Sequence, residues 1–388
     1  MNDTENNTDQ AAVPTTRKGK RVGWAVVLTL AAVLVVWGAW AWHQRGREQE
    51  RLNCYYPAPG QKTEVFEVVV VDMSASMLPV RSQMVDVLNS LVGGLKAVAG
   101  DYADSQEHYL TLSGVNTEVF SDIHFNTPLS LADSITTEQF IPWNNTPLVD
   151  AIGLTIDWMK RYTDSVQDYA VMLTIVTDGF ENSSENYSIR EVGEMIRQLD
   201  ADPHWEVTLL STDKDVAEQG RKLHISHTRL IPLYPETGRA WIEGTQRQLR
   251  HLCDNALARK KEMPTQPACK HITLEQLRER KALALAQQCV GYLEQELTEH
   301  PNTYNGHISM EEHSVVIAMQ CSQRTFDKLK SADEEQRQVL STFLLKSAQT
   351  NSVLLLRSMR VARMDYRLRA TCSETGEMLE IMVPYDKL

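Results

Sequence analysis

Two apolar stretches of the chain each end in an aspartate that is followed by further oxygen-bearing side chains. Asp72 follows the stretch 65–71 and begins the sequence Asp72-Met73-Ser74-Ala75-Ser76. Asp178 follows the stretch 170–177 and begins the sequence Asp-Gly-Phe-Glu-Asn-Ser-Ser. Carboxylates and hydroxyls are ligands that hard divalent cations such as Mg²⁺ prefer in proteins. The donors occupy every second position in Asp72-x-Ser74-x-Ser76, so an extended turn places them on the same side of the backbone. This spacing predicts a cation site.

The pattern around these stretches predicts a sheet that brings the two aspartates together. Short apolar runs are typical of strands covered on both faces, and here they alternate with segments of helical spacing. The expected strands are 65–71, 170–176 and 205–210, the expected helices are 80–98, 148–159 and 188–199, and 108–113 with 118–123 is an expected hairpin. This alternation predicts an α/β fold with a doubly wound, mostly parallel sheet.

Such sheets bind ligands beyond the carboxyl ends of their strands. Thr146 precedes one of the expected helices and could reach the same edge as the two aspartates. The resulting set of two carboxylates and three hydroxyls is Asp72, Ser74, Ser76, Thr146 and Asp178. Mg²⁺ takes about six oxygen ligands and tends to keep waters. Since only two carboxylates would neutralise the ion, a carboxylate from a partner could complete its shell.

The same motifs resemble the metal-ion-dependent adhesion site of von Willebrand factor type A domains. They are especially similar to bacterial and phage members of that family. The resemblance covers residues 64–235 and rests on D-x-S-x-S from Asp72, on Thr146-Pro147-Leu148-Val149-Asp150-Ala151-Ile152 and on Thr177-Asp178-Gly179.

The resemblance implies how the site works. Ser74, Ser76 and Thr146 would ligate Mg²⁺ or Mn²⁺ directly, whereas Asp72 and Asp178 would do so directly or through water. A protein ligand would supply an acidic oxygen to the metal. The chain departs from many relatives in having Asn145 where they have glycine before the threonine.

Other interpretations of these residues are a structural cap, an enzyme and a scaffold. Asp72 and Ser74 could merely cap a turn or a helix. Phosphatases of the haloacid dehalogenase type need a second aspartate where this chain has Ser74, and an alcohol of ordinary acidity cannot serve as their acid and base. The chain has neither G-x-S-x-G nor G-x-x-x-x-G-K-[ST]. We expect binding without turnover, with metal-activated hydrolysis, a structural metal and, from the resemblance, a partner of an AAA+ ATPase as alternatives.

Residues 23–42 contain no charged side chain. A helix of this length spans roughly 30 Å at about 1.5 Å per residue, which is the thickness of a bilayer core. The stretch is too long for the apolar core of a signal peptide. We expect a disordered tail at 1–22, a transmembrane helix at 23–42 and a juxtamembrane linker at 43–63. The expected location is a bacterial inner membrane, with the later domains outside the cytoplasm.

A second, smaller α+β domain is expected at 268–388, after a helix and linker at 236–267. The expected elements are helices at 274–297 and 334–348, a strand at 314–319 and a hairpin of 364–371 with 378–383. Five arginines in this region could form the solvated side of a strand pair or bind an acidic partner: Arg357, Arg360, Arg363, Arg367 and Arg369.

Charge and cysteine spacing exclude two further classes of site. Lys and Arg number 39 against 51 Asp and Glu, so the net charge is −12. A nucleic-acid binder would normally carry a basic face, so no nucleic-acid partner is expected. None of the six cysteines forms C-x-x-C, which argues against a zinc site. Buried free thiols are favoured, with a Cys253–Cys269 disulfide as the alternative.

Overall fold

The computed structural model describes most of the chain after residue 59. The described residues are 60–117, 120–164, 166, 168–178, 183–211, 216–225, 230–232, 238–263, 273–299, 306–333, 336–337 and 350–388. The expected tail at 1–22, the transmembrane helix at 23–42 and nearly all of the linker at 43–63 lie outside them. Within the described residues, no helix is both long enough and apolar enough to cross a bilayer.

A six-stranded sheet contains the candidate site, and its strand order is β3-β2-β1-β4-β5-β6. Five of the strands are parallel, and β3 at one edge runs antiparallel to β2. The strands are β1 (Thr63–Asp72), β2 (Gln106–Val115), β3 (Phe120–Pro128), β4 (Tyr169–Thr177), β5 (Trp205–Ser211) and β6 (Leu230–Pro232). The predicted mostly parallel sheet and the predicted hairpin, now β2 with β3, are confirmed. The short strand β6 was not predicted.

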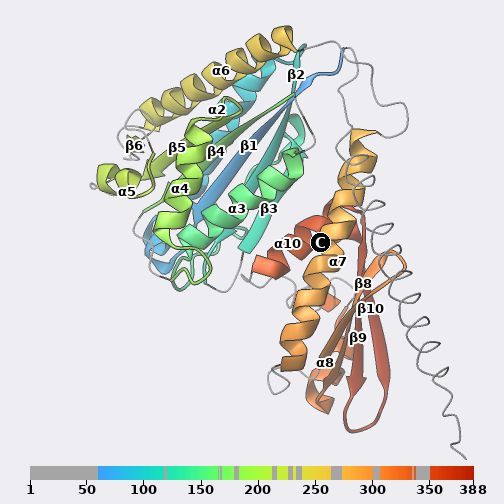
Figure 1. Ribbon diagram of the computed structural model, residues 1–388. Coiled ribbons are helices and arrows are strands. Elements are labelled where there is room, and N and C mark those ends of the chain that lie inside the picture. Colours follow the sequence, from blue (N-terminus) through green and yellow to red (C-terminus); the bar gives the residue numbers. More distant parts are fainter. Residues whose placement is uncertain are drawn as a thin grey trace, which may run out of the picture. The chain divides into compact units, whose positions relative to one another are not determined.

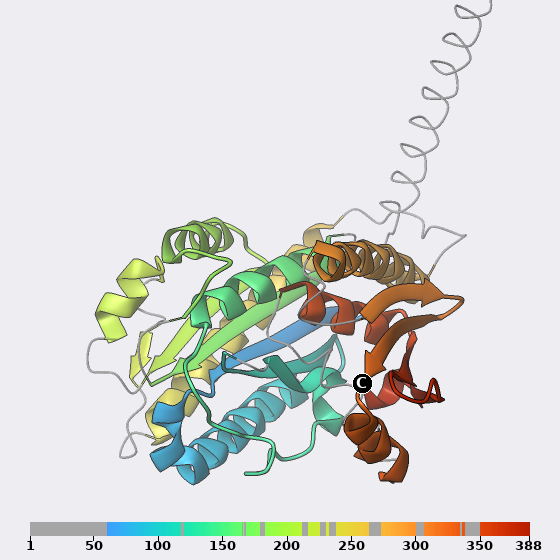
Figure 2. The ribbon, with the colours of Figure 1, turned by 90° about the horizontal axis from the view of Figure 1, so that it is seen from below.

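Helices cover both faces of this sheet, as Figures 1 and 2 show. One face carries α2 (Arg81–Asp101) and α6 (Gly238–Glu262), and the other carries α3 (Leu148–Thr163) and α4 (Ile189–Asp200). A further short helix is α5 (Val216–Lys222). Every residue of β1 is buried because alternate side chains enter the two cores, with Val69 on the α2 side and Val68 on the α3 side. The doubly wound arrangement is therefore confirmed.

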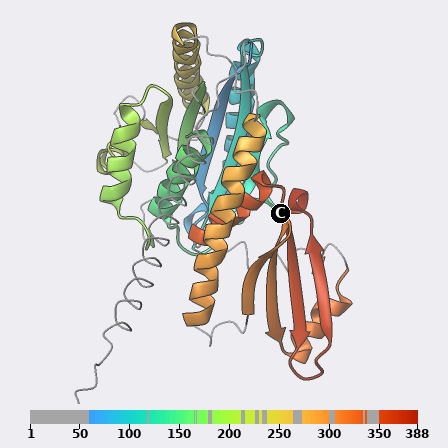
Figure 3. The same ribbon diagram turned by 45° about the vertical axis from the view of Figure 1, so that its right-hand side comes forward.

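A second sheet of four strands follows, in the order β10-β9-β8-β7 (Figure 3). It is mixed, because β8 and β9 are parallel while the two outer pairs are antiparallel. Its strands are β7 (Gly306–Glu311), β8 (Ser314–Cys321), β9 (Asp365–Cys372) and β10 (Met378–Val383), and its helices are α7 (Leu274–Glu299), α8 (Gln323–Ser331) and α10 (Thr350–Val361). The helix expected at 334–348 lies almost wholly outside the described residues.

Four cysteines of the described part are buried free thiols, as favoured from the sequence: Cys253, Cys289, Cys321 and Cys372. Cys54 and Cys269 lie outside the described residues. Burial raises the pKa of the Cys289 thiol to about 11, which keeps it protonated and unreactive near neutral pH.

The arginines near the carboxyl terminus do not form one solvated face. Arg367 and Arg369 do lie on the half-exposed face of β9, as expected. Arg357 and Arg360, however, belong to α10, and the side chain of Arg357 is fully buried. The expectation of a solvated strand face is thus wrong for these two. The reason is that the segment forms a helix and presents Arg357 to an acidic partner inside the same chain.

That partner is Asp122 on β3, whose side chain is 2% exposed. Nη2 of Arg357 donates to Asp122 Oδ1 at 2.9 Å and to Ser113 Oγ at 3.1 Å. The guanidinium also lies 5.0 Å from the centre of the Phe120 ring. Burial would raise the pKa of Asp122, but Arg357, Arg360 and the Ser113 hydroxyl outweigh it and hold this pKa below its ordinary value. Asp122 is therefore a carboxylate stabilised by an internal ion pair.

We expect Asp122→Asn to lower the free energy of unfolding at pH 7 by roughly 3–5 kcal/mol, because Arg357 would be left buried without a counter-charge. A carboxylate with a depressed pKa stabilises the fold above its unfolded pKa, and this contribution is lost as pH falls through the folded value. The gap between parent and variant should therefore narrow below about pH 4. Urea unfolding of the full chain at several pH values measures this.

The matched control is Glu311→Gln. It removes a partner of Arg369 from a pair whose side chains are 37% and 41% exposed, so its cost should stay below about 1 kcal/mol. If both variants lost the same free energy of unfolding, the buried Asp122–Arg357 pair would stabilise the fold no more than an exposed pair does.

Candidate metal centre

The five predicted residues gather at one edge of the first sheet. Strands β1 and β4 are parallel neighbours in the register Val71↔Val176, so the next residues, Asp72 and Thr177, end side by side. Asp178 follows directly. Thr146 lies just before α3, and Ser74 and Ser76 lie at the start of the 3₁₀ helix η1 (Ala75–Val80). Parallel strands thus bring together residues that are about a hundred positions apart, as predicted.

Asp72 lies at the centre of a set of hydrogen bonds and is 3% exposed. Its Oδ1 accepts from the Ser74 backbone N–H at 2.8 Å and from the Thr146 hydroxyl. Its Oδ2 accepts from Thr177 Oγ1 at 2.9 Å. The role of Thr177 was not predicted from the sequence, although its place in Thr-Asp-Gly, opposite the end of β1, was the available signal. These bonds fix the carboxylate of Asp72 in one orientation.

The two serines continue the chain of contacts to the second aspartate. Ser74 Oγ and Ser76 Oγ lie 2.7 Å apart, and Ser76 Oγ donates to Asp178 Oδ1 at 2.9 Å. Burial decreases along this chain, because Thr146 and Ser74 are buried whereas Ser76 is exposed. The centre is therefore closed around Asp72 and open to solvent at Ser76.

The electrostatics of the centre favour a cation. Burial raises the pKa of Asp178 above its ordinary value, and the negative charge of Asp72 adds to this rise while the Ser76 hydroxyl opposes it. Within the described residues, neither aspartate forms an ion pair with Lys, Arg or His. A divalent cation would offset both carboxylate charges.

The donor set fits Mg²⁺ or Mn²⁺, because it consists only of oxygen atoms. Hydroxyls make up the majority of the donors. In the part of the chain that the structure describes, no group of three or more His, Cys, Asp and Glu side chains lies together as a metal site. The candidate centre has two carboxylates only, so it differs from such groups and depends on its serines and threonine.

The loop that carries Thr146 is bonded to the loop that carries Ser74. The Trp143 N–H donates to the Met73 carbonyl at 2.9 Å, and the Ala75 N–H donates to the Asn144 carbonyl at 2.8 Å. Asn144 has φ 56°, a left-handed conformation that asparagine tolerates better than most residues. Asn145 does not have a left-handed conformation, so its position does not require a glycine.

Asp150, in the first turn of α3, attaches the segment that follows Asp178. Its carboxylate accepts from the backbone N–H groups of Glu185, Asn186 and Tyr187 at 2.9, 2.9 and 2.7 Å. Its own N–H donates to Ser184 Oγ at 2.9 Å. The segment 183–187 is thus held on the helix that begins just after Thr146. Sequence reasoning missed this role, because an acidic residue in a first helical turn is common for reasons of the helix dipole alone.

Tyr187 strengthens the same attachment. Its hydroxyl donates to Asp157 Oδ2 at 2.7 Å. Asp157 lies further along α3 than Asp150. Its ring lies over Gly153, where an added Cβ would come within 2.7 Å of the ring carbons. A side chain at position 153 would therefore displace Tyr187 from α3.

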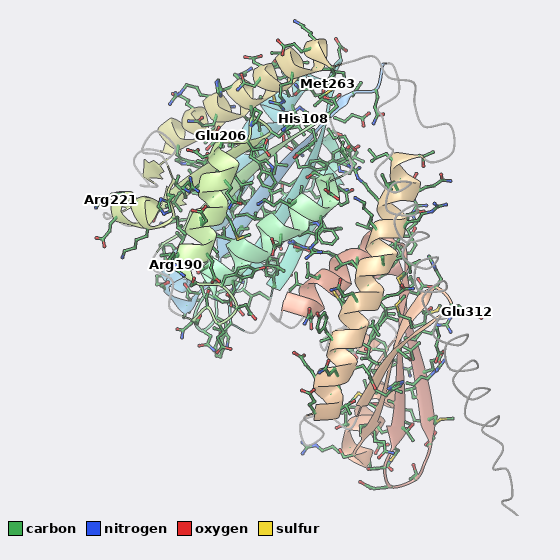
Figure 4. The ribbon with its side chains drawn as sticks, viewed as in Figure 1. His108, Arg190, Glu206, Arg221, Met263 and Glu312 are labelled. Atoms are coloured by element: carbon green, nitrogen blue, oxygen red, sulfur yellow. The ribbon has the colours of Figure 1, made fainter. Side chains whose placement is uncertain are left out.

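A second buried acid lies far from this centre. Glu67 is 2.5 Å from His108 Nδ1, and both side chains are nearly inaccessible. Burial raises the pKa of Glu67, although the contact with His108 opposes the rise. Figure 4 shows His108 and Glu206 near the amino-terminal ends of β2 and β5, whereas Arg190, at the start of α4, lies toward the opposite edge. The closed Glu67–His108 pair offers no open position for a ligand.

No known protein family matches the sequence, and no curated protein matches it. Several solved structures show distant structural similarity. Proximal thread matrix protein 1 from the mussel byssus is 13% identical, with a TM-score of 0.34 over 50% of this chain and 48% of its own. Manganese-loaded TRAP protein of Plasmodium vivax is 13% identical, with a TM-score of 0.34 over 48% and 74%. The pilus adhesin SpaC of Lactobacillus rhamnosus GG is 11% identical, with a TM-score of 0.31 over 52% and 30%.

The chain therefore spans about half the length of the first of these proteins. These structural similarities are distant.

Removing the Asp150 carboxylate tests whether the attached segment positions the centre. We expect Asp150→Ala to weaken Mn²⁺ binding about tenfold or more, as is usual when groups that orient metal ligands are lost. Isothermal titration of the full chain with MnCl₂ measures this, and thermal unfolding reports any general loss of stability.

Asp202→Ala provides the control. Asp202 also accepts a backbone N–H, from His204 at 2.9 Å, but it precedes β5 at the opposite edge of the sheet. Its loss should leave the Mn²⁺ affinity within about twofold of the parent, because it orients no metal ligand. If both variants bound Mn²⁺ like the parent, Asp150 would have no positioning role.

Proposed function

We propose that the chain is a membrane-anchored protein-binding module that uses a divalent cation to capture an acidic group on a protein partner. Asp72, Ser74, Ser76, Thr146 and Asp178 would hold Mg²⁺ or Mn²⁺. The observation that carries the proposal is the unbroken set of contacts from Thr146 through Asp72, Ser74 and Ser76 to Asp178. The resemblance of these motifs to the adhesion site of von Willebrand factor type A domains supports it.

Each residue contributes in a way that follows from its surroundings. Asp72 is held by three donors and orients Ser74 and Thr146. Ser76 and Asp178 lie at the open side, where a partner could approach. A bound cation would act as a Lewis acid toward an incoming carboxylate oxygen. Since the remaining protein ligands would be neutral hydroxyls, the ion would keep Lewis acidity toward one further carboxylate oxygen from a partner.

The location of the module is part of the proposal. Residues 23–42 would anchor the chain in a bacterial inner membrane, and both sheets would lie outside the cytoplasm. A reporter fused after residue 388, active only on one side of the membrane, distinguishes this arrangement from cytoplasmic exposure. Activity of a cytoplasmic reporter would instead favour the alternative role as partner of an AAA+ ATPase.

Titration of the full chain with Mn²⁺ and Mg²⁺ tests the cation site. We expect one ion per chain, and we expect Asp178→Asn and Ser76→Ala each to lower the affinity by at least tenfold, because each loses a ligand at the open side. The effect of these losses on folding should be small, since Ser76 is exposed and Asp178 is only half-buried. Circular dichroism checks the folding of each variant.

Two outcomes would contradict the proposal. One is a folded parent that takes up neither ion, and the other is an Asp178→Asn variant that binds as tightly as the parent. Mg²⁺-dependent hydrolysis of a phosphoester by the parent, abolished in Asp72→Ala, would favour a hydrolase instead.

A further inference from the structure

Three large apolar side chains are exposed beside the candidate metal centre. Leu78, Ile141 and Trp143 are 57%, 58% and 61% exposed. They are three of the nine exposed large hydrophobic side chains in the described part of the chain, and they fall within two short segments that are bonded to each other. We call these three residues the apolar rim. Single exposed apolar residues are ordinary, whereas a group of them marks an interaction surface.

The backbone holds the apolar rim next to the metal ligands. The bonds from Trp143 to Met73 and from Ala75 to Asn144 lie on the two sides of Ser74. Leu78 belongs to η1, whose first turn is closed by the bond from the Met77 N–H to the Ser74 carbonyl at 3.1 Å. Leu78 is two positions after the ligand Ser76, and Trp143 is three positions before the ligand Thr146. The apolar rim therefore lies beside Ser76, at the open side of the centre.

The far end of the rim is also fixed. Arg81, which follows η1, donates from Nε to the Phe140 carbonyl at 2.8 Å, next to Ile141. Phe140 itself is fully buried, so it anchors the segment that carries the exposed residues Ile141 and Trp143. Bonds at both ends hold the backbone that carries the exposed side chains before any partner arrives, which lowers the entropic cost of binding.

We infer that the partner presents its acidic side chain next to an apolar residue, and that the apolar rim receives this residue while the cation receives the carboxylate. This inference rests on the proposed function, because it assigns a second contact to the same partner. Tryptophan is enriched among residues that dominate binding energy in protein interfaces. Trp143 is the largest side chain of the rim and is expected to contribute most.

A protein segment fits this surface better than a lipid bilayer does. The chain has a net charge of −12, and an anionic membrane surface repels negative charge. A carboxylate flanked by an apolar side chain matches the two parts of the surface, a cation beside exposed apolar groups. A segment of a second copy of this chain is an outcome that the experiment below identifies by sequence.

Selection from a peptide library tests the inference on the full chain held in lipid nanodiscs. The probe is a phage-displayed library of 12-residue peptides with one invariant central aspartate and random neighbours, selected in the presence of Mn²⁺ and eluted with chelator. We expect Trp, Phe, Leu, Ile or Met next to the aspartate in at least threefold excess over the starting library. The affinity of selected peptides should fall about tenfold or more in Trp143→Ser, as is usual for interface hot spots.

Two measurements separate this inference from the proposed function. Mn²⁺ affinity should stay within twofold of the parent in Trp143→Ser, because that side chain ligates no metal. Leu131→Ser is the matched control, since Leu131 is 70% exposed but follows Pro128, which pairs with Tyr109 near the amino-terminal end of β2. Its peptide affinity should equal that of the parent.

If the parent bound no Mn²⁺, the proposed function would fail. If the parent bound Mn²⁺ but recovered no peptide, recovered peptides without an apolar neighbour, or kept its preference in Trp143→Ser, only the further inference would fail. Mn²⁺-dependent binding of the nanodiscs to phosphatidylglycerol vesicles that is lost in Trp143→Ser would overturn it in favour of a lipid surface. Selected peptides that match a segment of this chain would specify a second copy as the partner and support the inference.

Discussion

At the ends of β1 and β4, two carboxylates lie close enough to repel each other. The loops at this edge of the first sheet supply the hydrogen-bond donors that stabilise them. A parallel pair in the register Val71↔Val176 brings Asp72 and Asp178 together, and burial makes their negative charges costly. Hydrogen bonds from Ser74, Thr146 and Thr177 stabilise the first charge, and Ser76 stabilises the second. The loops that carry these donors are in turn fixed by bonds among Met73, Asn144 and their neighbours.

Other buried acids of the same chain show what a structural carboxylate looks like. Asp122 is paired with Arg357, and its pKa lies below the ordinary value. Glu67 is paired with His108 and is closed to solvent. The centre at Asp72 and Asp178 differs from both, because it combines a raised pKa at Asp178 with an open side at Ser76. Each of these two acids has its partner inside the protein, whereas the pair at Asp72 and Asp178 is suited to a cation from solution.

The sequence was sufficient to predict those features that depend on local pattern. Apolar runs ending in aspartate located β1 and β4, and parallel pairing then implied that Asp72 and Asp178 meet. The bonds of Asp150 were beyond such reasoning, because they depend on which backbone N–H groups the loop 184–187 presents. The burial of Arg357 could not be predicted either. Its partner Asp122 is 235 positions away, and the local sequence of α10 does not specify this pairing.

Helix α10 is connected to the candidate centre through β2. Val115, the last residue of β2, is the register partner of Asp72 on one side and of Phe120 on the other. Its carbonyl also accepts from the Met73 N–H at 2.9 Å. Arg357 of α10 packs on Phe120 and bonds to Ser113, two residues before Val115. Helix α10 therefore packs on the end of β2 that pairs with Asp72. A fragment that ended before α10 would leave Asp122 without the guanidinium of Arg357.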